Sequence, residues 1–349
     1  MKVHCQQLLR PLTLLGMATG LLFTTLSTAQ DEERWYQIEL FVFTHESANA
    51  QTSETWEPTP ELIYPPQYRF LVDPALVEKN LAMFDASSEM DDRGHQTLTV
   101  IPPPEEEETV EPPQSAEAEL EPLLEASEPE EMLPVTPTPF TFLAKSELEF
   151  RGKAAYMQRT GRYRILFHET WVQPILAEGD TLPIVIDRSG DTETWPQLQG
   201  SVKLYLSRYL HLETNLWLNT AGAYLPPGWR MPAAPLGPKS LTIIYPPEPE
   251  VEEDLQEAPI DTGFFTGTST DSEVDAELEQ LEPTGPIYPW RHAIALQQKR
   301  KMRSTEVHYI DHPMLGVVVK VSPLDEEALR ERAAAEFSLL QPEDEAVNR

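Results

Sequence analysis

The most constraining feature of the sequence is an alternation of side-chain type that runs for seventeen residues, from Val202 to Leu218. Even positions are aliphatic except at Arg208 and Thr214, and odd positions are polar or aromatic. Because successive side chains of a β strand point to opposite faces, this period of two predicts an apolar face and a polar-aromatic face. The run is either one very long strand or a pair bent by a bulge near Arg208 or Thr214. Such one-sided sheets are usually antiparallel, and we expect helices to cover the apolar side.

Shorter patterns elsewhere predict further strands and a few helices. Apolar alternation predicts strands over residues 34–43, 163–171, 292–303, 305–310 and 316–321. The last two would form a hairpin around the turn Asp311-His312-Pro313. Since strands do not alternate regularly with helices, we expect an α+β fold, mainly an antiparallel sheet with long strands and a few helices on one face.

Three segments carry helix signals. Asp73 followed by Pro74 predicts a capped helix over 74–83. Residues 145–159 are expected to be helical, with Leu148, Ala155 and Met157 on one face and Gly161 just beyond the end. A last helix is expected to start at Ser322-Pro323-Leu324-Asp325, with one face made of four apolar residues, Leu329, Ala333, Phe337 and Leu340.

Two acidic segments interrupt this pattern. Residues 101–139 contain ten Pro and twelve Glu without a Lys or Arg, and residues 246–283 contain thirteen acidic residues and again no base. Such sequences bury too little apolar surface to offset the entropy of ordering, so we predict disordered insertions over 101–139 and 246–286. The formal net charge of −32 argues against nucleic acid as the main partner.

The amino terminus has the pattern of an export signal. Lys2 and Arg10 precede an uncharged stretch from Leu12 to Leu26, and Ser27-Thr28-Ala29 offers the small residues of a cleavage site. We predict a signal peptide over 1–29, cut after Ala29, and a periplasmic protein without a stable membrane span after cleavage. The alternative, an uncleaved anchor, needs about 20 apolar residues. The folded domain would then comprise residues 30–100, 140–245 and 287–349.

Motifs for catalysis or metal binding are weak. The single cysteine, Cys5, excludes an intramolecular disulfide and a cysteine-based zinc site. His308 and His312 are spaced as in a helical zinc motif, but their segment is predicted to be a strand followed by a proline turn. The sequence contains no GxSxG or SxxK motif. We therefore predict no catalytic residues, no metal and no cofactor, while a cell-wall hydrolase with scattered carboxylates stays an alternative.

Four stretches together resemble one known family. They are WYQIELFVF (residues 35–43), GRYRILFHETWVQ (161–173), RYLHLETNLWL (208–218) and KMRSTEVHYIDHPMLGVVVKVSP (301–323). In this order they are similar to the CsiV family of exported peptidoglycan-binding proteins. The resemblance implies a non-enzymatic accessory protein that supports cell-wall assembly and cell shape. It also implies a partner, an envelope lipoprotein that activates a penicillin-binding synthase.

Residues suited to such a ligand occur in two basic clusters and on the polar-aromatic face. Aromatic rings stack on sugar faces, and basic side chains pair with the carboxylates of stem peptides. The candidates for glycan or peptide binding are Arg300, Lys301, Arg303, Arg162, Arg164, Tyr205, Tyr209 and Trp217. Each could instead serve packing or local charge balance. A protein–protein adaptor that touches no glycan is the remaining alternative.

Overall fold

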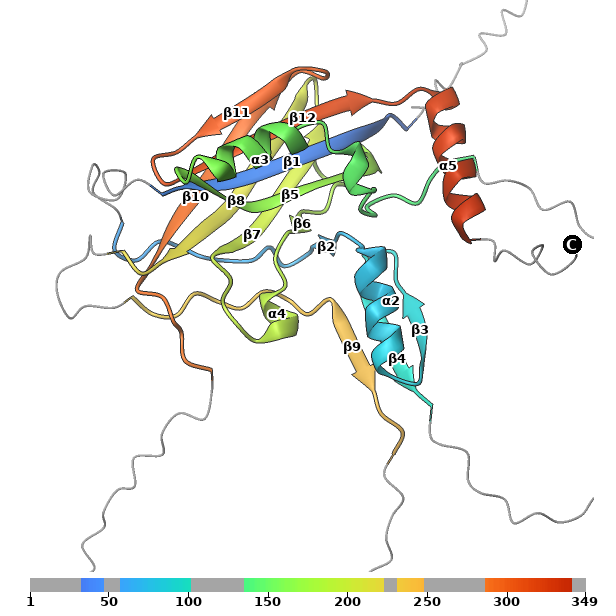
Figure 1. Cartoon of the computed structure of the whole chain (residues 1–349), viewed down its shortest axis with the longest axis horizontal. Coiled ribbons are helices and arrows are strands. Elements are labelled where there is room, and N and C mark those ends of the chain that lie inside the picture. Colours follow the sequence, from blue (N-terminus) through green and yellow to red (C-terminus); the bar gives the residue numbers. More distant parts are fainter. Residues whose placement is uncertain (1–32, 47–56, 102–134, 223–230, 248–285, 341–349) are drawn as a thin grey trace, which may run out of the picture. The chain divides into compact units, whose positions relative to one another are not determined.

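The computed structural model describes residues 33–46, 57–101, 135–222, 231–247 and 286–340. These residues form twelve strands and a few short helices, whose arrangement can be followed in Figure 1. Strands dominate and pair mainly antiparallel, so the expected α+β class is confirmed. The predicted signal peptide, the anchor alternative and nearly all of both predicted acidic insertions lie outside the described residues. The domain boundaries therefore stay predictions. In the part of the chain described, no helix is long and apolar enough to cross a membrane.

The first sheet is built around the amino-terminal strand. Its order is β11-β12-β1-β5, and all three pairings are antiparallel. The strands are β1 (Trp35–His45), β5 (Tyr163–Pro174), β11 (Val307–Asp311) and β12 (Leu315–Pro323). The predicted hairpin of the last two strands is confirmed. Phe43 lies opposite Gly316, where an added Cβ would come within 2.3 Å of the Phe43 ring, so only glycine fits beneath this ring.

The second sheet contains the alternating run. Its order is β10-β8-β7-β6-β2, and only the β2–β6 pair is parallel. The strands are β2 (Arg69–Phe70), β6 (Ile184–Val185), β7 (Leu198–Leu206), β8 (Leu210–Thr220) and β10 (His292–Met302).

The alternating run is a hairpin, not one long strand or a bent pair. The chain reverses at Ser207-Arg208-Tyr209, and Leu206 pairs with Leu210 across the turn. Because this connection has three residues, even positions on β7 lie opposite even positions on β8, and the alternation continues unbroken through the reversal. Of the residues that favour turns, this turn contains only Ser207, which is a weaker signal of a reversal than Gly, Pro or Asn.

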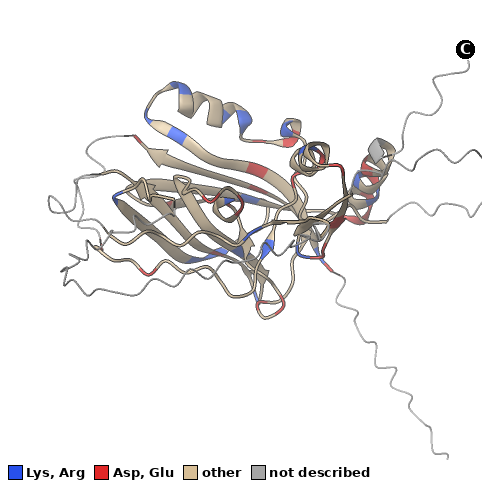
Figure 2. Ribbon diagram, turned by 90° about the horizontal axis from the view of Figure 1, so that it is seen from below, with Lys and Arg blue, Asp and Glu red and all other residues tan. Residues whose placement is uncertain are grey.

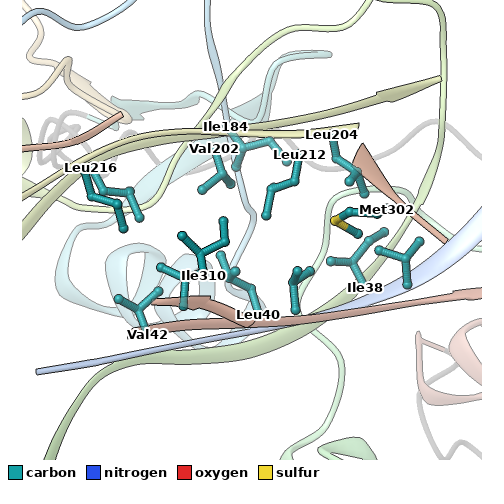
Figure 3. Close-up of a cluster of buried hydrophobic side chains, with 14 of the residues drawn as sticks. Ile38, Leu40, Val42, Ile184, Val202, Leu204, Leu212, Leu216, Met302 and Ile310 are labelled. Carbon is teal, nitrogen blue, oxygen red and sulfur yellow. The ribbon is translucent and has the colours of Figure 1, made fainter. Parts of the chain in front are cut away.

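The apolar faces of the two sheets form one core. The largest cluster of buried side chains contains Ile38, Leu40 and Val42 of β1 together with Val202, Leu204, Leu212 and Leu216 of the hairpin. Figure 3 shows these side chains meeting between the two layers. The expectation that helices cover the apolar side of the hairpin is therefore wrong. The residues of the first sheet bury that side, because their own apolar alternation presents a matching face.

The helices lie at the periphery. They are α2 (Pro74–Met83), a 3-10 turn η1 (Lys145–Glu147), α3 (Arg151–Arg159), α4 (Ser189–Thr192) and α5 (Glu326–Leu340). The cap of α2 is confirmed, since the Asp73 side chain accepts a hydrogen bond from the Ala75 amide (3.2 Å). Helix α5 begins later than expected. Its cap is Asp325, which accepts from the Ala328 amide (2.9 Å), while Ser322 still belongs to β12.

The expected helix over 145–159 is interrupted at residues 148–150. Leu148 and Phe150 are buried, and the Glu39 carboxylate of β1 accepts hydrogen bonds from the Glu149 and Phe150 amides (2.8 and 2.9 Å). These contacts end η1, and α3 starts afterwards. Ala154 rather than Ala155 is the buried residue of α3, packed near Phe41 and Phe43 on the outer face of the first sheet. Gly161 has a φ of +68°, as expected for the residue that ends a helix.

A third, small sheet was not predicted. It consists of β3 (Ala86–Met90), β4 (Gln96–Val100) and β9 (Leu241–Ile244), in the order β3-β4-β9. The β4–β9 pair is parallel and joins two distant parts of the chain. The strand β3 carries the sequence ASSEM, which has low strand propensity, and this explains why the pattern of apolar residues did not reveal it.

Candidate functional site

The polar-aromatic face predicted from the alternation is the outer face of the second sheet. It consists of the odd-numbered positions of β7, β8 and β10, because Tyr205 pairs with His211 and Glu213 pairs with both Lys203 and Lys299. Other segments of the chain cover the end of this face around Trp217, which we call the Trp217 half. The end around Tyr205 is not covered in this way, and we call it the Tyr205 half.

Irregular segments bury the Trp217 half. Trp217 is fully buried in a small second core, together with Met231, Ala234 and Ala293. The Tyr64 ring packs edge-on against the Trp217 ring, with 4.9 Å between centroids. The covering residues come from segments near 62–64, 231–234 and 288, which cross this part of the sheet without forming strands on it.

A buried polar network fixes these segments in place. The Asp187 carboxylate accepts hydrogen bonds from the Tyr64 hydroxyl (2.8 Å), the Ser189 amide and hydroxyl (3.0 and 2.6 Å) and the Gly200 amide (2.8 Å). Burial and the neighbouring Asp187 charge raise the pKa of the Tyr64 phenol far above its ordinary range. Tyr64 therefore stays a neutral donor, and the carboxylate has its hydrogen bonds satisfied inside the protein.

The side-chain amide of Gln199 extends this network to Trp217. Its nitrogen donates to the Ser189 hydroxyl and the Pro235 carbonyl (3.0 and 3.1 Å), and its oxygen accepts from Trp217 Nε1 (3.2 Å) and Asn219 Nδ2 (2.7 Å). Trp217 thus has a partner for its only polar atom. This half of the face is structural, and the proposed binding role of Trp217 has no exposed surface on which to act.

The Tyr205 half is open and contains a groove. The cavity has a volume of about 340 Å³. Its lining combines proline rings, amides, hydroxyls and charges, from Pro65, Pro183, Ser201, Lys203, Glu213, Thr214, Asn215, Gln297, Gln298 and Lys299. We call it the Lys203 groove.

Cations and aromatic rings are interleaved beside the groove. The rings of Tyr205 and His211 stack with centroids 5.2 Å apart, and the Nζ atoms of Lys299 and Lys203 lie 5.0 and 5.6 Å from the Tyr205 ring centre. These contacts leave Tyr205 without exposed surface although its strand position faces outward. Tyr205 therefore organises the lysines rather than offering a ring to a ligand.

The two lysines of the groove differ in their charge partners. Lys299 Nζ lies 2.9 Å from carboxylate oxygens of both Glu213 and Glu178. Hydrogen bonding with Tyr205, Glu213 and Glu178 raises the pKa of Lys299, so it stays charged. Among the described residues, Lys203 forms no ion pair, although it lines the same groove. Of these two lysines, Lys203 is thus the better placed to meet an anionic ligand, although its charge also acts on the nearby Glu178 carboxylate.

A second exposed platform lies at the β7–β8 turn. Tyr209 is 41% exposed, and Lys301 Nζ of β10 lies 3.0 Å from its ring centre. The guanidinium of Arg208 approaches the same ring at 5.5 Å. The turn therefore combines the accessible ring of Tyr209 with two cations, Lys301 and Arg208. This is the combination expected at a surface that binds glycans with attached peptides.

The structure brings together only some of the predicted site residues. Tyr205, Tyr209 and Lys301 share the open half. Arg300 pairs with Leu212 and belongs to the even positions, so its side chain leaves the opposite side of β10 from Lys301. Arg303 follows the strand and pairs with Glu306 (3.5 Å). Because β10 is an edge strand of its sheet, the charges of these two arginines can also discourage unwanted pairing with strands of other molecules.

The remaining two predicted basic residues lie on the other sheet. Arg162 and Arg164 are at the start of β5, next to α3, whose helix also carries basic residues (Figure 2). Arg164 Nε pairs with Glu46 at 2.9 Å. The predicted binding set therefore does not form one surface. The groove residues Lys203, Glu213 and Lys299 were not among the predicted candidates. Their odd positions were readable from the alternation, but their cross-strand pairing was not, because the reversal between β7 and β8 left the pattern unbroken.

The two spaced histidines have separate local roles. His308 Nε2 lies within hydrogen-bond distance of the Arg303 amide and carbonyl (3.0 and 3.1 Å). The Nδ1 atom of His312 accepts from the Met314 amide (3.2 Å) and so shapes the turn before β12. Among the described residues, no cluster of three or more His, Cys, Asp or Glu side chains could hold a metal ion.

The outer face of the first sheet contains a buried acid and a smaller recess of about 220 Å³. Burial alone would raise the pKa of Glu39, but hydrogen bonds from His168 (2.7 Å) and from the Phe150 and Glu149 amides outweigh it and lower that pKa. Lys320 at the recess pairs with Glu149. These groups are engaged in holding α3 on the sheet, which leaves little free polarity for a ligand.

Comparison with protein families agrees with the resemblance seen in the sequence. The model of the family described as "CsiV: Peptidoglycan-binding protein, CsiV" matches residues 13–324. This match covers most of the chain, so the chain belongs to the CsiV family of peptidoglycan-binding proteins. No curated protein and no solved structure matches it.

Proposed function

We propose that this member of the CsiV family binds peptidoglycan through the Lys203 groove and the adjoining Tyr209–Lys301 platform. The observation that carries this proposal is the open half of the second sheet, where exposed aromatic, amide and cationic groups lie side by side. The family gives the ligand class, and this surface has the groups that such a ligand needs.

The chemistry of peptidoglycan fits these groups. Its N-acetyl sugars present apolar ring faces, for which the Tyr209 ring is an exposed platform. Their acetamido groups both donate and accept hydrogen bonds, as do the side-chain amides of Asn215 and Gln297 at the groove. These two amides also bond to each other (3.1 Å) and to the Ile63 and Glu61 carbonyls (2.8 and 3.1 Å), so a ligand would use their remaining donor and acceptor positions. The carboxylates of stem peptides would pair with Lys203 and Lys301.

The same contacts support a non-enzymatic role. The two most buried carboxylates of the described residues, Glu39 and Asp187, each accept several hydrogen bonds from the surrounding protein. Such fully engaged carboxylates are poorly suited to take up or release a proton during catalysis. We therefore propose an accessory protein of cell-wall assembly in the periplasm, reached through the signal peptide over 1–29. In keeping with the family resemblance, it would act with a lipoprotein activator of a penicillin-binding synthase.

The experiment is co-sedimentation of the purified mature protein with isolated sacculi at low and moderate salt. We expect pelleting that weakens as salt rises, because exposed cation–carboxylate contacts are screened. Each of Lys203→Ala and Lys301→Ala should weaken binding about two- to fivefold, the range that corresponds to an exposed ion pair.

Arg300→Ala provides a control on the same strand. Arg300 and Lys301 are neighbours with the same charge, but they leave opposite sides of β10. If Arg300→Ala and Lys301→Ala weaken binding equally, then the positive charge of the edge strand attracts the ligand from either side, and the groove is not the site. A protein that stays in the supernatant at both salt concentrations would favour the adaptor alternative instead.

A further inference from the structure

Three charged residues form a row across the lining of the Lys203 groove. In the register of the second sheet, Lys203 of β7 and Lys299 of β10 both lie opposite Glu213 of β8. The Cβ atoms of directly opposite residues are about 5 Å apart, so a positive, a negative and a positive side chain follow one another on three neighbouring strands. The groove therefore presents both signs of charge to one small ligand.

The acid of this row keeps part of its carboxylate available. Glu213 receives contacts from Lys299 Nζ (2.9 Å) and from the Tyr205 hydroxyl (3.1 Å), and both reach its Oε1 atom. Among the described residues, none donates a hydrogen bond to the Oε2 atom. The side chain of Glu213 is 33% exposed, so a ligand in the groove can reach this oxygen and donate to it.

Lys203 lies beside this acid without pairing with it. The two residues are direct cross-strand neighbours, yet no ion pair joins them, and no acceptor in the described part of the chain takes a hydrogen bond from Lys203 Nζ. This atom lies 5.6 Å from the Tyr205 ring centre instead. An ammonium group and a carboxylate oxygen thus share one groove, each with bonding capacity that the described residues leave unused.

The charges at the groove cancel, which favours a ligand that carries both signs. Lys203 and Lys299 are balanced by Glu213 and by Glu178, which pairs with Lys299 (2.9 Å) but does not line the groove. A ligand with only a carboxylate would be attracted by Lys203 and repelled by Glu213, and a ligand with only an amine would meet the reverse. A ligand with both groups is complementary to both residues.

The neighbouring row suits the peptide groups of the same ligand. Ser201, Asn215 and Gln297 lie opposite one another on the three strands and line the same groove. Each is two residues along its strand from a charged residue, so the two rows are about 7 Å apart. Their hydroxyl and amide groups can bond the N–H and C=O groups of a peptide whose charged end lies at the first row.

We propose that the Lys203 groove selects an amino-acid end with a carboxylate and a free amine on the same carbon. The carboxylate pairs with Lys203, and the ammonium group donates to Oε2 of Glu213. This inference rests on the proposed function, because peptidoglycan supplies the ligand. A stem peptide with a diamino acid presents such an end until a cross-link converts the amine into an uncharged amide. The groove thus distinguishes stem peptides that are not cross-linked from those that are.

The test uses the full mature chain and three synthetic peptides. The reference is acetyl-L-Ala-γ-D-Glu-meso-diaminopimelic acid, whose only free amine belongs to the diamino acid. The second peptide has this amine acetylated, and the third has the carboxyl group on the same carbon converted into an amide. Isothermal titration calorimetry measures the affinity of each peptide for the wild type and the variants. Melting curves and sacculus pelleting are recorded in parallel.

The variants are Lys203→Ala, Glu213→Gln and Glu178→Gln. Glu178→Gln is the matched control, because it removes the same charge from the other partner of Lys299, outside the lining of the groove. We expect the wild type to bind the reference about fivefold more tightly than either modified peptide, the difference that corresponds to one exposed ion pair. Glu213→Gln should lose the preference over the acetylated peptide, and Lys203→Ala the preference over the amidated one. Glu178→Gln should keep both.

Equal affinity of the wild type for the three peptides would overturn this inference. Loss of both preferences in Glu178→Gln would also overturn it, because the overall charge, and not the contact with Glu213, would then decide the binding. If no peptide binds but pelleting with sacculi still depends on Lys203, the inference is wrong and the proposed function stands. Failure of the proposed function has a different sign, which is the absence of wild-type pelleting.

Discussion

The two halves of the outer face of the second sheet carry the same alternation of residues, but one half is buried and the other is open to solvent. At one end, Trp217 is sealed by irregular segments and a network around Asp187. At the other, Lys203, Tyr209 and Lys301 face an open groove and its rim. The difference arises from whether a remote segment of chain crosses the strand positions. A polar-aromatic strand face is thus equally compatible with a core and with a binding surface.

The largest difference between the two halves should appear when the buried side chain of Trp217 is removed from the covered half. Trp217→Ala should lower the free energy of unfolding by about 3–5 kcal/mol, because it leaves a cavity and removes the partner of Gln199. Urea denaturation followed by circular dichroism measures the change. Tyr209→Ala is the control in the open half, and we expect it to stay within about 0.5 kcal/mol of the wild type. Similar losses for both would mean that the halves do not differ.

A smaller effect should follow from weakening the network that holds the covering segments. Asp187→Asn keeps the shape but removes the charge that four donors share. We expect a loss of about 1.5–3 kcal/mol, the range for hydrogen bonds to a charged group. Added protease should then cut the covering segments sooner in this variant than in the wild type. An unchanged unfolding curve would contradict a role for Asp187 in sealing the Trp217 half.

The buried acid of the other sheet predicts a dependence on pH. The folded-state pKa of Glu39 is lowered from its ordinary value of 4.5, so the unfolded chain takes up this proton first as pH falls. The stability that Glu39 contributes is therefore full above about pH 4.5 and is lost as pH falls through the lower, folded-state pKa. Comparing unfolding curves of the wild type and Glu39→Gln between pH 3 and 7 tests this. The two should converge at acid pH, and parallel curves would contradict the prediction.

The smallest effect on stability should come from the predicted acidic insertion. Deleting residues 104–134 should leave the melting temperature unchanged, because the prediction places this segment outside the folded domain. Differential scanning calorimetry of the shortened chain is the measurement. A large drop in melting temperature would show that the segment belongs to the folded domain.

The sequence carried more information about the core than about the binding face. Alternation identified the long strands because the aliphatic positions of β1, β7 and β8 all serve one apolar layer. It could not identify what lies on that layer, since a second sheet and a set of helices require the same apolar face. The reversal at Ser207-Arg208-Tyr209 was hidden because its three residues preserve the parity of the pattern.

The candidate site was predicted by residue type, and this explains both its successes and its errors. Tyr209 and Lys301 meet because their strands are neighbours through β8 and the turn. Trp217 has the same parity as Tyr205, but irregular segments that contain Tyr64, Met231 and Tyr288 cover it, and no local pattern predicts that. Arg162 and Arg164 are basic, like the lysines of the groove, but the topology places them on the first sheet, away from the groove.

The position of β1 determines when the first sheet can be completed. β1 is among the first described segments of the chain, yet one of its two neighbours is β12, almost at the other end, with Gln37 opposite Ser322. Chains are made from the amino terminus at roughly 5–20 residues per second, so β1 waits on the order of tens of seconds for this neighbour. During that time its apolar edge is available to other strands. Aggregation of newly made chains should therefore depend on how long synthesis takes to reach β12.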